Sequence, residues 1–124
     1  GDRFLRHVER TKLLLHLVDV SSLSGRDPVG DYETINRELT AYDERLAGRP
    51  QIVVATKIDA LDEPDRLERL RARAGEDGRA FYAVSSVTNR GVRELVNAVA
   101  RELEEIAGDK GERERPRAAG EAGP

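Results

Sequence analysis

The sequence predicts an α/β fold, in which a three-layer, doubly wound parallel sheet of three strands is flanked by three to four helices. Three short apolar runs alternate along the 124 residues with three amphipathic segments. This alternation is typical of parallel strands joined by right-handed helical crossovers, with helices on both faces of the sheet. Hydrophobic residues make up 38% of the chain but aromatic residues only 4%, so we expect an aliphatic core. A sheet of three strands is thin, so we expect one of its edges to have been covered originally by further structure.

The three apolar runs are the predicted strands. Residues 12–20 are nearly continuous in apolar side chains, as expected of a strand buried on both faces. Residues 51–55 and 80–84 have the same pattern. We expect an unpaired edge of this small sheet to make the isolated chain marginally stable or prone to association.

Helices are predicted between and around these strands. Asp27 and Pro28 supply an N-cap and a first-turn proline, so a helix is expected over residues 28–47. Its apolar stripe is Tyr32, Ile35, Leu39, Tyr42 and Leu46. Further helices are expected over residues 64–75 and 91–106, and a short one over residues 2–10.

Residues 108–124 contain Gly, Pro, Ala and charged side chains without periodicity. We therefore expect one domain over residues 1–107, followed by a disordered charged tail over 108–124. The chain lacks methionine and begins with Gly1, which we interpret as an internal start within a longer protein.

The composition gives weaker constraints on function. The 21 basic and 24 acidic residues are interleaved, as on solvated helix faces, and their balance argues neither for nor against a nucleic-acid partner. No cysteine is present, which excludes disulfides and thiolate metal sites. No apolar run approaches the roughly 18–20 residues that span a bilayer, and no signal peptide is visible, so we expect a cytoplasmic protein without a membrane span.

Polar motifs follow two of the predicted strands. Thr56, Lys57, Ile58 and Asp59 come directly after the second strand, and the triplet over residues 85–87 follows the third. The carboxyl ends of parallel strands meet at one edge of the sheet, where α/β proteins bind ligands. A rigidly held aspartate there can accept two adjacent hydrogen bonds from guanine, namely from N1–H and the N2 amine. Adenine has no such donor pair, so the motifs indicate half of a guanine site.

The phosphate half of such a site is missing. A P-loop needs a glycine-rich turn ending in Gly-Lys-Ser/Thr, whose backbone amides surround the phosphates. The three lysines, Lys12, Lys57 and Lys110, follow Thr11, Thr56 and Asp109, and none follows a glycine.

In these motifs and in longer stretches the chain resembles the Obg family of translation-factor-class P-loop GTPases. The stretches of resemblance are residues 3–11, 15–21, 25–28 and 31–39, and together with the motifs they extend over about residues 1–106. The resemblance identifies the tetrapeptide over 56–59 as the Asn/Thr-Lys-x-Asp base-recognition motif. It identifies residues 85–87 as the Ser-Ala-x motif, whose backbone N–H meets guanine O6.

The resemblance implies an incomplete half of a P-loop GTPase domain, with GTP or GDP bound at Thr56, Lys57, Asp59, Ser85, Ser86 and Val87. It also implies a GTP-hydrolysing protein that acts in assembly of the large ribosomal subunit, with the ribosome or its RNA, and not DNA, as partner. The P-loop, the switches and the Mg²⁺ ion would belong to the complete domain only. Without them this chain is expected not to hydrolyse GTP alone, and no residue in it is assigned as catalytic or metal-binding.

Two positions depart from the family pattern. Thr56 stands where asparagine is more usual, which removes an amide that ties the base loop to the P-loop. Ser86 replaces alanine, which matters little if only its backbone is used. We expect the aliphatic stem of Lys57 to lie along the base plane. The Thr56 hydroxyl either braces the loop or belongs to a plain threonine at the end of the strand.

Simpler interpretations accompany these assignments. Asp59 has the alternative role of a turn aspartate, and Lys57 that of a solvated lysine. We interpret Asp19 as a cap at the end of its strand, facing the loop at Ser21. His7 and His16 lack the paired spacing of a metal site and are interpreted as packing residues.

Two other classes of function compete with the GTPase. A non-catalytic interaction module that retains a relic guanine site would use the helices over 2–10 and 28–47 as partner surfaces. A receiver- or flavodoxin-like domain would need an acidic cluster or a phosphate loop that this sequence lacks. A circularly permuted GTPase would need a P-loop after Val87, and none follows.

Overall fold

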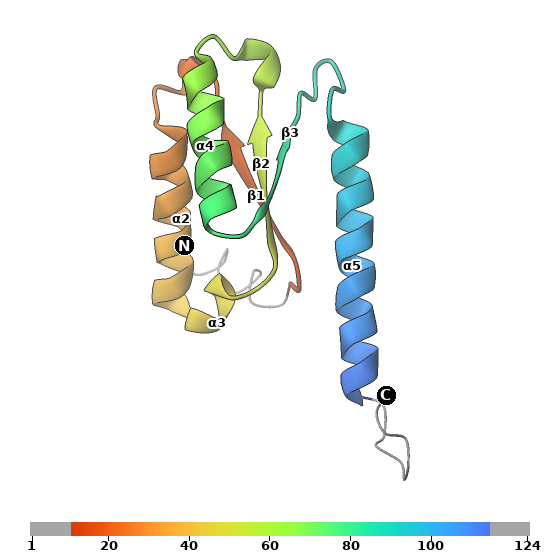
Figure 1. Ribbon diagram of the computed structural model, residues 1–124. Helices are drawn as coiled ribbons and strands as arrows, with labels where there is room; N and C mark the ends of the chain where they lie inside the picture. Colours follow the sequence, from red (N-terminus) through yellow and green to blue (C-terminus); the bar gives the residue numbers. More distant parts are fainter. Residues whose placement is uncertain (1–10, 115–124) are drawn as a thin grey trace.

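A computed structural model describes residues 11–114 and shows an α/β fold with one parallel sheet (Figure 1). Strand β1 (Leu14–Asp19) pairs with the central strand β2 (Gln51–Thr56), which pairs in turn with β3 (Ala80–Ala83). The spatial order β1-β2-β3 follows the chain, because each strand is joined to the next by a helical connection. The predicted helix over residues 2–10 lies outside the described residues.

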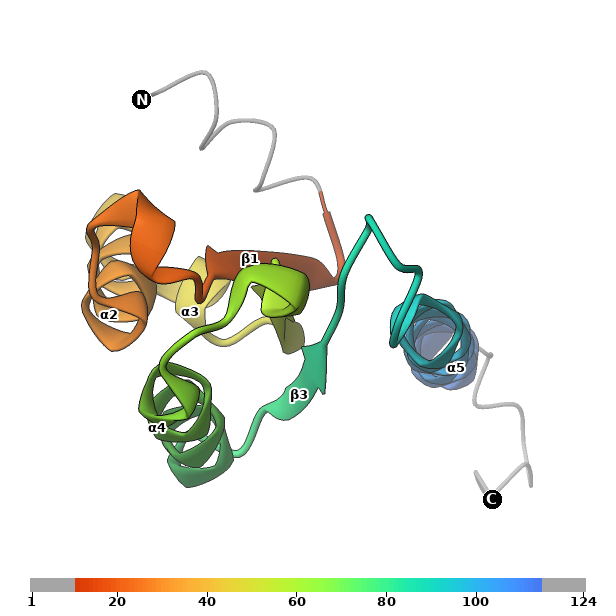
Figure 2. The same ribbon diagram turned by 90° about the horizontal axis from the view of Figure 1, so that it is seen from above.

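Helices α2 (Pro28–Tyr42) and α4 (Pro64–Glu76) cover one face of the sheet, and the short helix α3 (Glu44–Ala47) follows α2 (Figure 2). The core on this face is aliphatic apart from one tyrosine, as the composition predicts. Its buried members are Val18, Val20, Tyr32, Val53, Ala55, Leu70 and Ala74. The predicted start of the 28–47 helix is confirmed, because Asp27 accepts a hydrogen bond from the amide of Gly30 at 3.0 Å and Pro28 is the first helical residue.

Helix α5 (Val92–Glu114) lies on the opposite face and completes the three layers (Figure 2). Val92, Leu95 and Val99 pack there on Ile52 and Val54 of the central strand. β1 is less covered on this side, since Leu15 is 44% exposed and Leu17 is 62% exposed. The expectation that the first strand is buried on both faces is therefore wrong for β1, because α5 packs over β2 and β3.

Two predicted helix boundaries differ from the structure. The helix expected over 28–47 is interrupted at Asp43, which adopts an extended conformation with φ of −163° and caps α3 by accepting a hydrogen bond from the Arg45 amide at 3.0 Å. An aspartate favours such a break because its side chain replaces the helical hydrogen bond. The helix expected to end at residue 106 continues to Glu114. Residues 108–114 are thus helical, and the prediction of a disordered tail is wrong for them.

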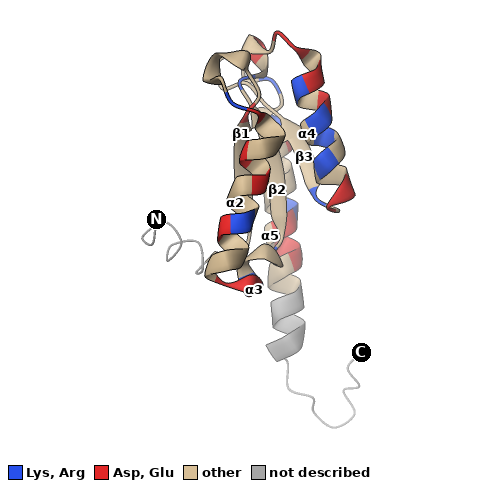
Figure 3. Ribbon diagram, turned by 90° about the vertical axis from the view of Figure 1, so that its left-hand side faces the viewer, with Lys and Arg blue, Asp and Glu red and all other residues tan. Residues whose placement is uncertain are grey.

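The charged surface of α4 mixes both signs (Figure 3). Arg69 pairs with Asp27 and Asp65, Arg71 pairs with Glu68, and Arg73 contacts Glu33 and Asp77. These arginines are therefore neutralised locally, as expected of a solvated helix face. None of the described helices is both long and apolar enough to cross a membrane.

Candidate functional site

Three loops meet at the carboxyl edge of the sheet, and they include both predicted motifs. The loop after β1 is joined to β2 by a hydrogen bond from the Val20 amide to the Thr56 carbonyl at 3.2 Å. The loop after β2 is joined to the end of β3 by a bond from the Ile58 amide to the Val84 carbonyl at 3.4 Å. The three loops therefore form one continuous surface above the strands.

The loop after β2 presents Lys57 and Asp59 to solvent. Ile58 packs against the main core, and residues Ile58–Ala60 form a 3₁₀ turn closed by a bond from the Ala60 amide to the Lys57 carbonyl at 2.9 Å. Lys57 lies in the left-handed region with φ of 62°. Such a conformation is uncommon for a residue with a side chain and is often found at functional sites. The partly buried Ile58 thus fixes the two polar residues beside it at the surface.

Asp59 is held by the second motif. The hydroxyl of Ser85 donates a hydrogen bond to Oδ1 of Asp59 at 2.7 Å. Ser85 is fully buried, and its oxygen also accepts a bond from the Thr88 amide at 3.1 Å. The Asp59 side chain itself is exposed. The structure therefore brings the predicted aspartate and serine together and leaves the carboxylate open to a ligand.

The loop after β3 closes over the strand end. The Ser85 amide donates to the Arg90 carbonyl at 3.0 Å, and Gly91 returns the chain to the sheet with φ of 77°. A Cβ on Gly91 would lie 2.1 Å from the carbonyl oxygen of Ala83, so this close approach requires glycine. Ser86 is exposed, and 80% of the Val87 side chain is exposed. Within the described part of the chain, the amides of Ser86 and Val87 have no hydrogen-bond partner.

Asp19 lies at the same edge and was assigned only as a strand-end cap from the sequence. That assignment is confirmed, since Oδ1 of Asp19 accepts bonds from the Ser21 amide at 2.8 Å and the Ser21 hydroxyl at 2.7 Å. The sequence did not reveal its second contact, in which Oδ2 lies 3.1 Å from Nζ of Lys57. Partial burial of the carboxyl raises its pKa, but the hydrogen bonds from Ser21 and the charge of Lys57 outweigh this and hold the pKa of Asp19 below its usual value.

Two residues of the α4 region brace the loop after β1, and sequence reasoning missed both. Arg66 donates to the carbonyls of Val20 at 3.0 Å and Ser21 at 3.1 Å, and also to the carbonyl of Arg26. Asp62 accepts a 2.6 Å bond from the Ser22 hydroxyl. No local sequence pattern signals these contacts, because the partners are 40 or more residues apart.

Thr56 and His16, which were also singled out from the sequence, form no hydrogen bond or ring contact with Lys57 or Asp59 within the described part of the chain. The Thr56 hydroxyl makes no hydrogen bond to another described residue, so its bracing role stays a prediction. His16 stacks on Tyr32 with ring centroids 5.2 Å apart, and Nδ1 lies 2.9 Å from Oε1 of Gln51. Burial lowers the pKa of His16, and these contacts confirm it as a packing residue. Among the described residues, no three His, Cys, Asp or Glu side chains are grouped as a metal site.

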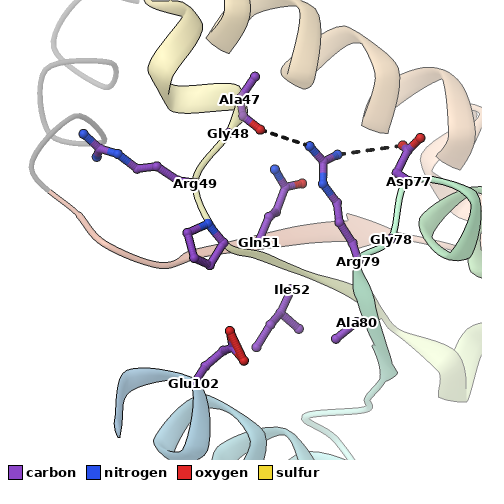
Figure 4. Close-up of a pocket in the computed structure, with 11 residues that line it drawn as sticks. Ala47, Gly48, Arg49, Gln51, Ile52, Asp77, Gly78, Arg79, Ala80 and Glu102 are labelled. Atoms are coloured by element: carbon purple, nitrogen blue, oxygen red, sulfur yellow. Dashed lines mark hydrogen bonds and ion pairs between the residues drawn. The ribbon is translucent and has the colours of Figure 1, made fainter. Parts of the chain in front are cut away.

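A cavity of about 290 Å³ lies at the amino ends of β2 and β3 (Figure 4). Its main polar group, Arg79, contacts the Ala47 carbonyl at 3.4 Å and Asp77 at 3.8 Å. Arg79 also donates to the Tyr32 hydroxyl at 2.5 Å. None of the predicted site residues lines this cavity. The Arg79 guanidinium joins α2 and α3 to the start of β3.

Comparison with known proteins finds relatives that are similar to this chain over most of its length. No family model matches it. The chain is 53% identical over 107 residues to a protein named GTPase Obg from Acidobacterium capsulatum, covering 86% of the chain and 31% of that protein. It is 50% identical over 106 residues to GTPase Obg of Aquifex aeolicus, with 86% and 31% covered. It is 48% identical over 106 residues to GTPase Obg of Alkaliphilus oremlandii, with 86% and 25% covered.

The chain therefore spans between a quarter and a third of the length of these relatives. At this level of identity over most of its residues, the chain belongs to the Obg family of GTPases.

Proposed function

We propose that this chain recognises the guanine base of GTP or GDP as part of a GTP-binding, Obg-like protein. The observation that carries the proposal is the pairing of Asp59 with the buried Ser85 at the carboxyl edge of the sheet. The hydrogen bond fixes one carboxylate oxygen while the side chain stays accessible. The relatives' name, GTPase Obg, supports guanine as the base.

The roles of the site residues follow from their donors and acceptors. The Asp59 carboxylate accepts hydrogen bonds from N1–H and the N2 amine of guanine, a charge-assisted pair that adenine cannot supply. The amides of Ser86 and Val87 are the available donors for O6, since the Ser85 amide is already bonded to Arg90. The aliphatic stem of Lys57 lies along one face of the base. Thr56 ends β2 and sets where this loop begins.

Hydrolysis of GTP is assigned to the complete protein. Phosphoryl transfer depends on positioning and charge neutralisation by a P-loop, Mg²⁺ and switch residues. The 124 residues contain no Gly-Lys-Ser/Thr sequence, and the described part offers no cluster of carboxylates for a cation. The chain thus supplies base recognition, with nucleotide affinity on the order of millimolar by itself. A cytoplasmic location and a role in large-subunit assembly, through ribosomal RNA or protein, are proposed for the complete protein from the family resemblance.

Nucleotide binding tests the proposal. The full-length protein is titrated with fluorescent GDP, and unlabelled GDP and ADP are compared as competitors. We expect GDP to compete at least about 100-fold better, because ADP leaves the Asp59 carboxylate unpaired. The variant Asp59→Ala should remove this preference. Equal competition by GDP and ADP, or an Asp59→Ala variant with unchanged affinity, would instead favour a non-catalytic interaction module with a relic guanine site.

A further inference from the structure

We propose that Asp19 is a positioning residue for guanine binding, which acts by fixing the side chain of Lys57. Asp19 ends β1 and is the register partner of Thr56, the last residue of β2, so Lys57 follows directly beside it in the loop after β2. Oδ2 of Asp19 lies 3.1 Å from Nζ of Lys57. This inference rests on the proposed function, because Lys57 is assigned there to the face of the base.

Asp19 is itself held rigidly. Its Oδ1 takes two bonds from Ser21, whose side chain is fully buried, and Arg66 bonds the Ser21 carbonyl at 3.1 Å from α4. One oxygen is thus committed to the fold, and the other faces the lysine. Most surface ion pairs lose side-chain conformational entropy when they form. A carboxylate that is already restrained in this way loses little of it.

Lys57 depends on such an anchor. Its side chain is 63% exposed, so packing against the body of the protein restrains the four-carbon stem only weakly. Among the described residues, Asp19 is its one ion-pair partner. Pairing of the ammonium group with Asp19 ties the Lys57 side chain to the end of β1 and so restricts the positions that its stem can take at the carboxyl edge. A base that stacks on this stem then meets a surface that is already ordered.

The inference separates two tasks within one site. Asp59 reads the identity of the base through hydrogen bonds, whereas Asp19 and Lys57 order the surface against which the base lies. Loss of Asp19 should weaken binding without changing the ratio of GDP to ADP affinity. We expect a loss of about two- to fivefold, the range measured for single exposed ion pairs.

A double-mutant cycle in the full-length protein tests the coupling. GDP dissociation constants are measured for the wild type, Asp19→Asn, Lys57→Met and the double variant. Methionine keeps an unbranched stem but removes the charge. We expect Asp19→Asn to weaken GDP binding in the wild-type background and to have no further effect in the Lys57→Met background. Asp62→Asn is the matched control, since Asp62 also accepts a serine hydroxyl in this region but forms no ion pair with Lys57.

The outcomes distinguish the two proposals. A wild-type protein without preference for GDP overturns the proposed function and this inference with it. If the wild type binds GDP selectively, the inference alone is overturned by unchanged affinity in Asp19→Asn, or by an equal loss in both backgrounds. An equal loss in both backgrounds means that Asp19 supports only the fold, and a matching fall in Tm for all Asp19 variants would accompany it.

Discussion

The Ser85 hydroxyl donates a 2.7 Å hydrogen bond to Oδ1 of Asp59, and this bond joins two loops that follow different strands. Ser85 is buried, so its hydroxyl is fixed by the fold, and Asp59 is exposed, so its carboxylate is free to meet a ligand. The orientation of the Asp59 carboxylate is therefore set from inside the protein. Four predictions follow from this site and the elements that position it.

The variant Ser85→Ala should lower guanine-nucleotide affinity by about 3- to 10-fold, because the Asp59 carboxylate loses the hydrogen bond that orients it but keeps the bonds proposed to the base. It should also lower thermal stability, since the Thr88 amide loses its acceptor. Isothermal titration with GDP and thermal unfolding measure the two effects. Ser86→Ala serves as the control, because Ser86 is exposed and is assigned a role only through its backbone. Equal effects of the two substitutions would contradict the role of Ser85.

The variant Gly91→Ala should destabilise the chain by at least about 2 kcal/mol. The new Cβ would lie 2.1 Å from the Ala83 carbonyl oxygen, and the residue would keep a φ of 77°. Urea unfolding measures the change in the free energy of unfolding.

Gly75→Ala provides the opposite control. Gly75 lies in α4, and a Cβ there meets nothing within 4 Å. Alanine at this position should stabilise the helix by up to about 1 kcal/mol. If Gly91→Ala were tolerated as well as Gly75→Ala, the tight turn that places residues 85–87 would be wrong.

Acid should weaken the capping of α3. Hydrogen bonds from the side chain and the backbone amide of Arg45 lower the pKa of Asp43 from 3.8 to about 2. The unfolded chain therefore binds a proton at this position at higher pH than the folded chain does. The stabilisation by ionised Asp43 is fully present above about pH 4 and is lost as the pH falls toward 2.

A carboxyl NMR titration measures this pKa directly, and unfolding between pH 5 and pH 2 measures its effect on stability. Asp43→Asn keeps a capping side chain but cannot titrate, so its stability should depend less steeply on pH in that range. An Asp43 pKa near 4 in the folded protein would show that the contact with Arg45 does not form.

The sequence was sufficient to predict the three strands, their parallel arrangement and the common edge at which the two motifs lie. The apolar periodicity of each segment and the capping pair Asp27 and Pro28 are local signals, and they place elements well. The break at Asp43 was missed because the apolar stripe continues from α2 through Leu46, so periodicity alone gives no sign of the turn.

The sequence predicted which residues lie at the candidate site, but it did not predict the contacts between their side chains. Ser85 and Asp59 were placed together by topology, and the structure adds the hydrogen bond that joins them. The ion pair of Asp19 with Lys57 and the contacts of Arg66 were not predicted, because they depend on side-chain directions across different strands and helices. The left-handed backbone of Lys57 was not predicted either, because no glycine or asparagine in the motif signals a positive φ.

The base preference of Asp59→Asn tests the central claim most directly. In the full-length protein, affinities for GDP and for XDP are measured for the wild type and the variant. Xanthine carries a carbonyl where guanine carries the N2 amine, so an asparagine amide can donate to it where the Asp59 carboxylate can only accept. Loss of a charge-assisted hydrogen bond corresponds to about 1.5–3 kcal/mol, or roughly 10- to 100-fold.

We predict that Asp59→Asn binds GDP at least about tenfold more weakly than the wild type and gains affinity for XDP. Thermal unfolding of both proteins confirms that the variant is folded. A folded variant that retains the wild-type preference for GDP over XDP would contradict the assignment of Asp59 as the residue that reads guanine.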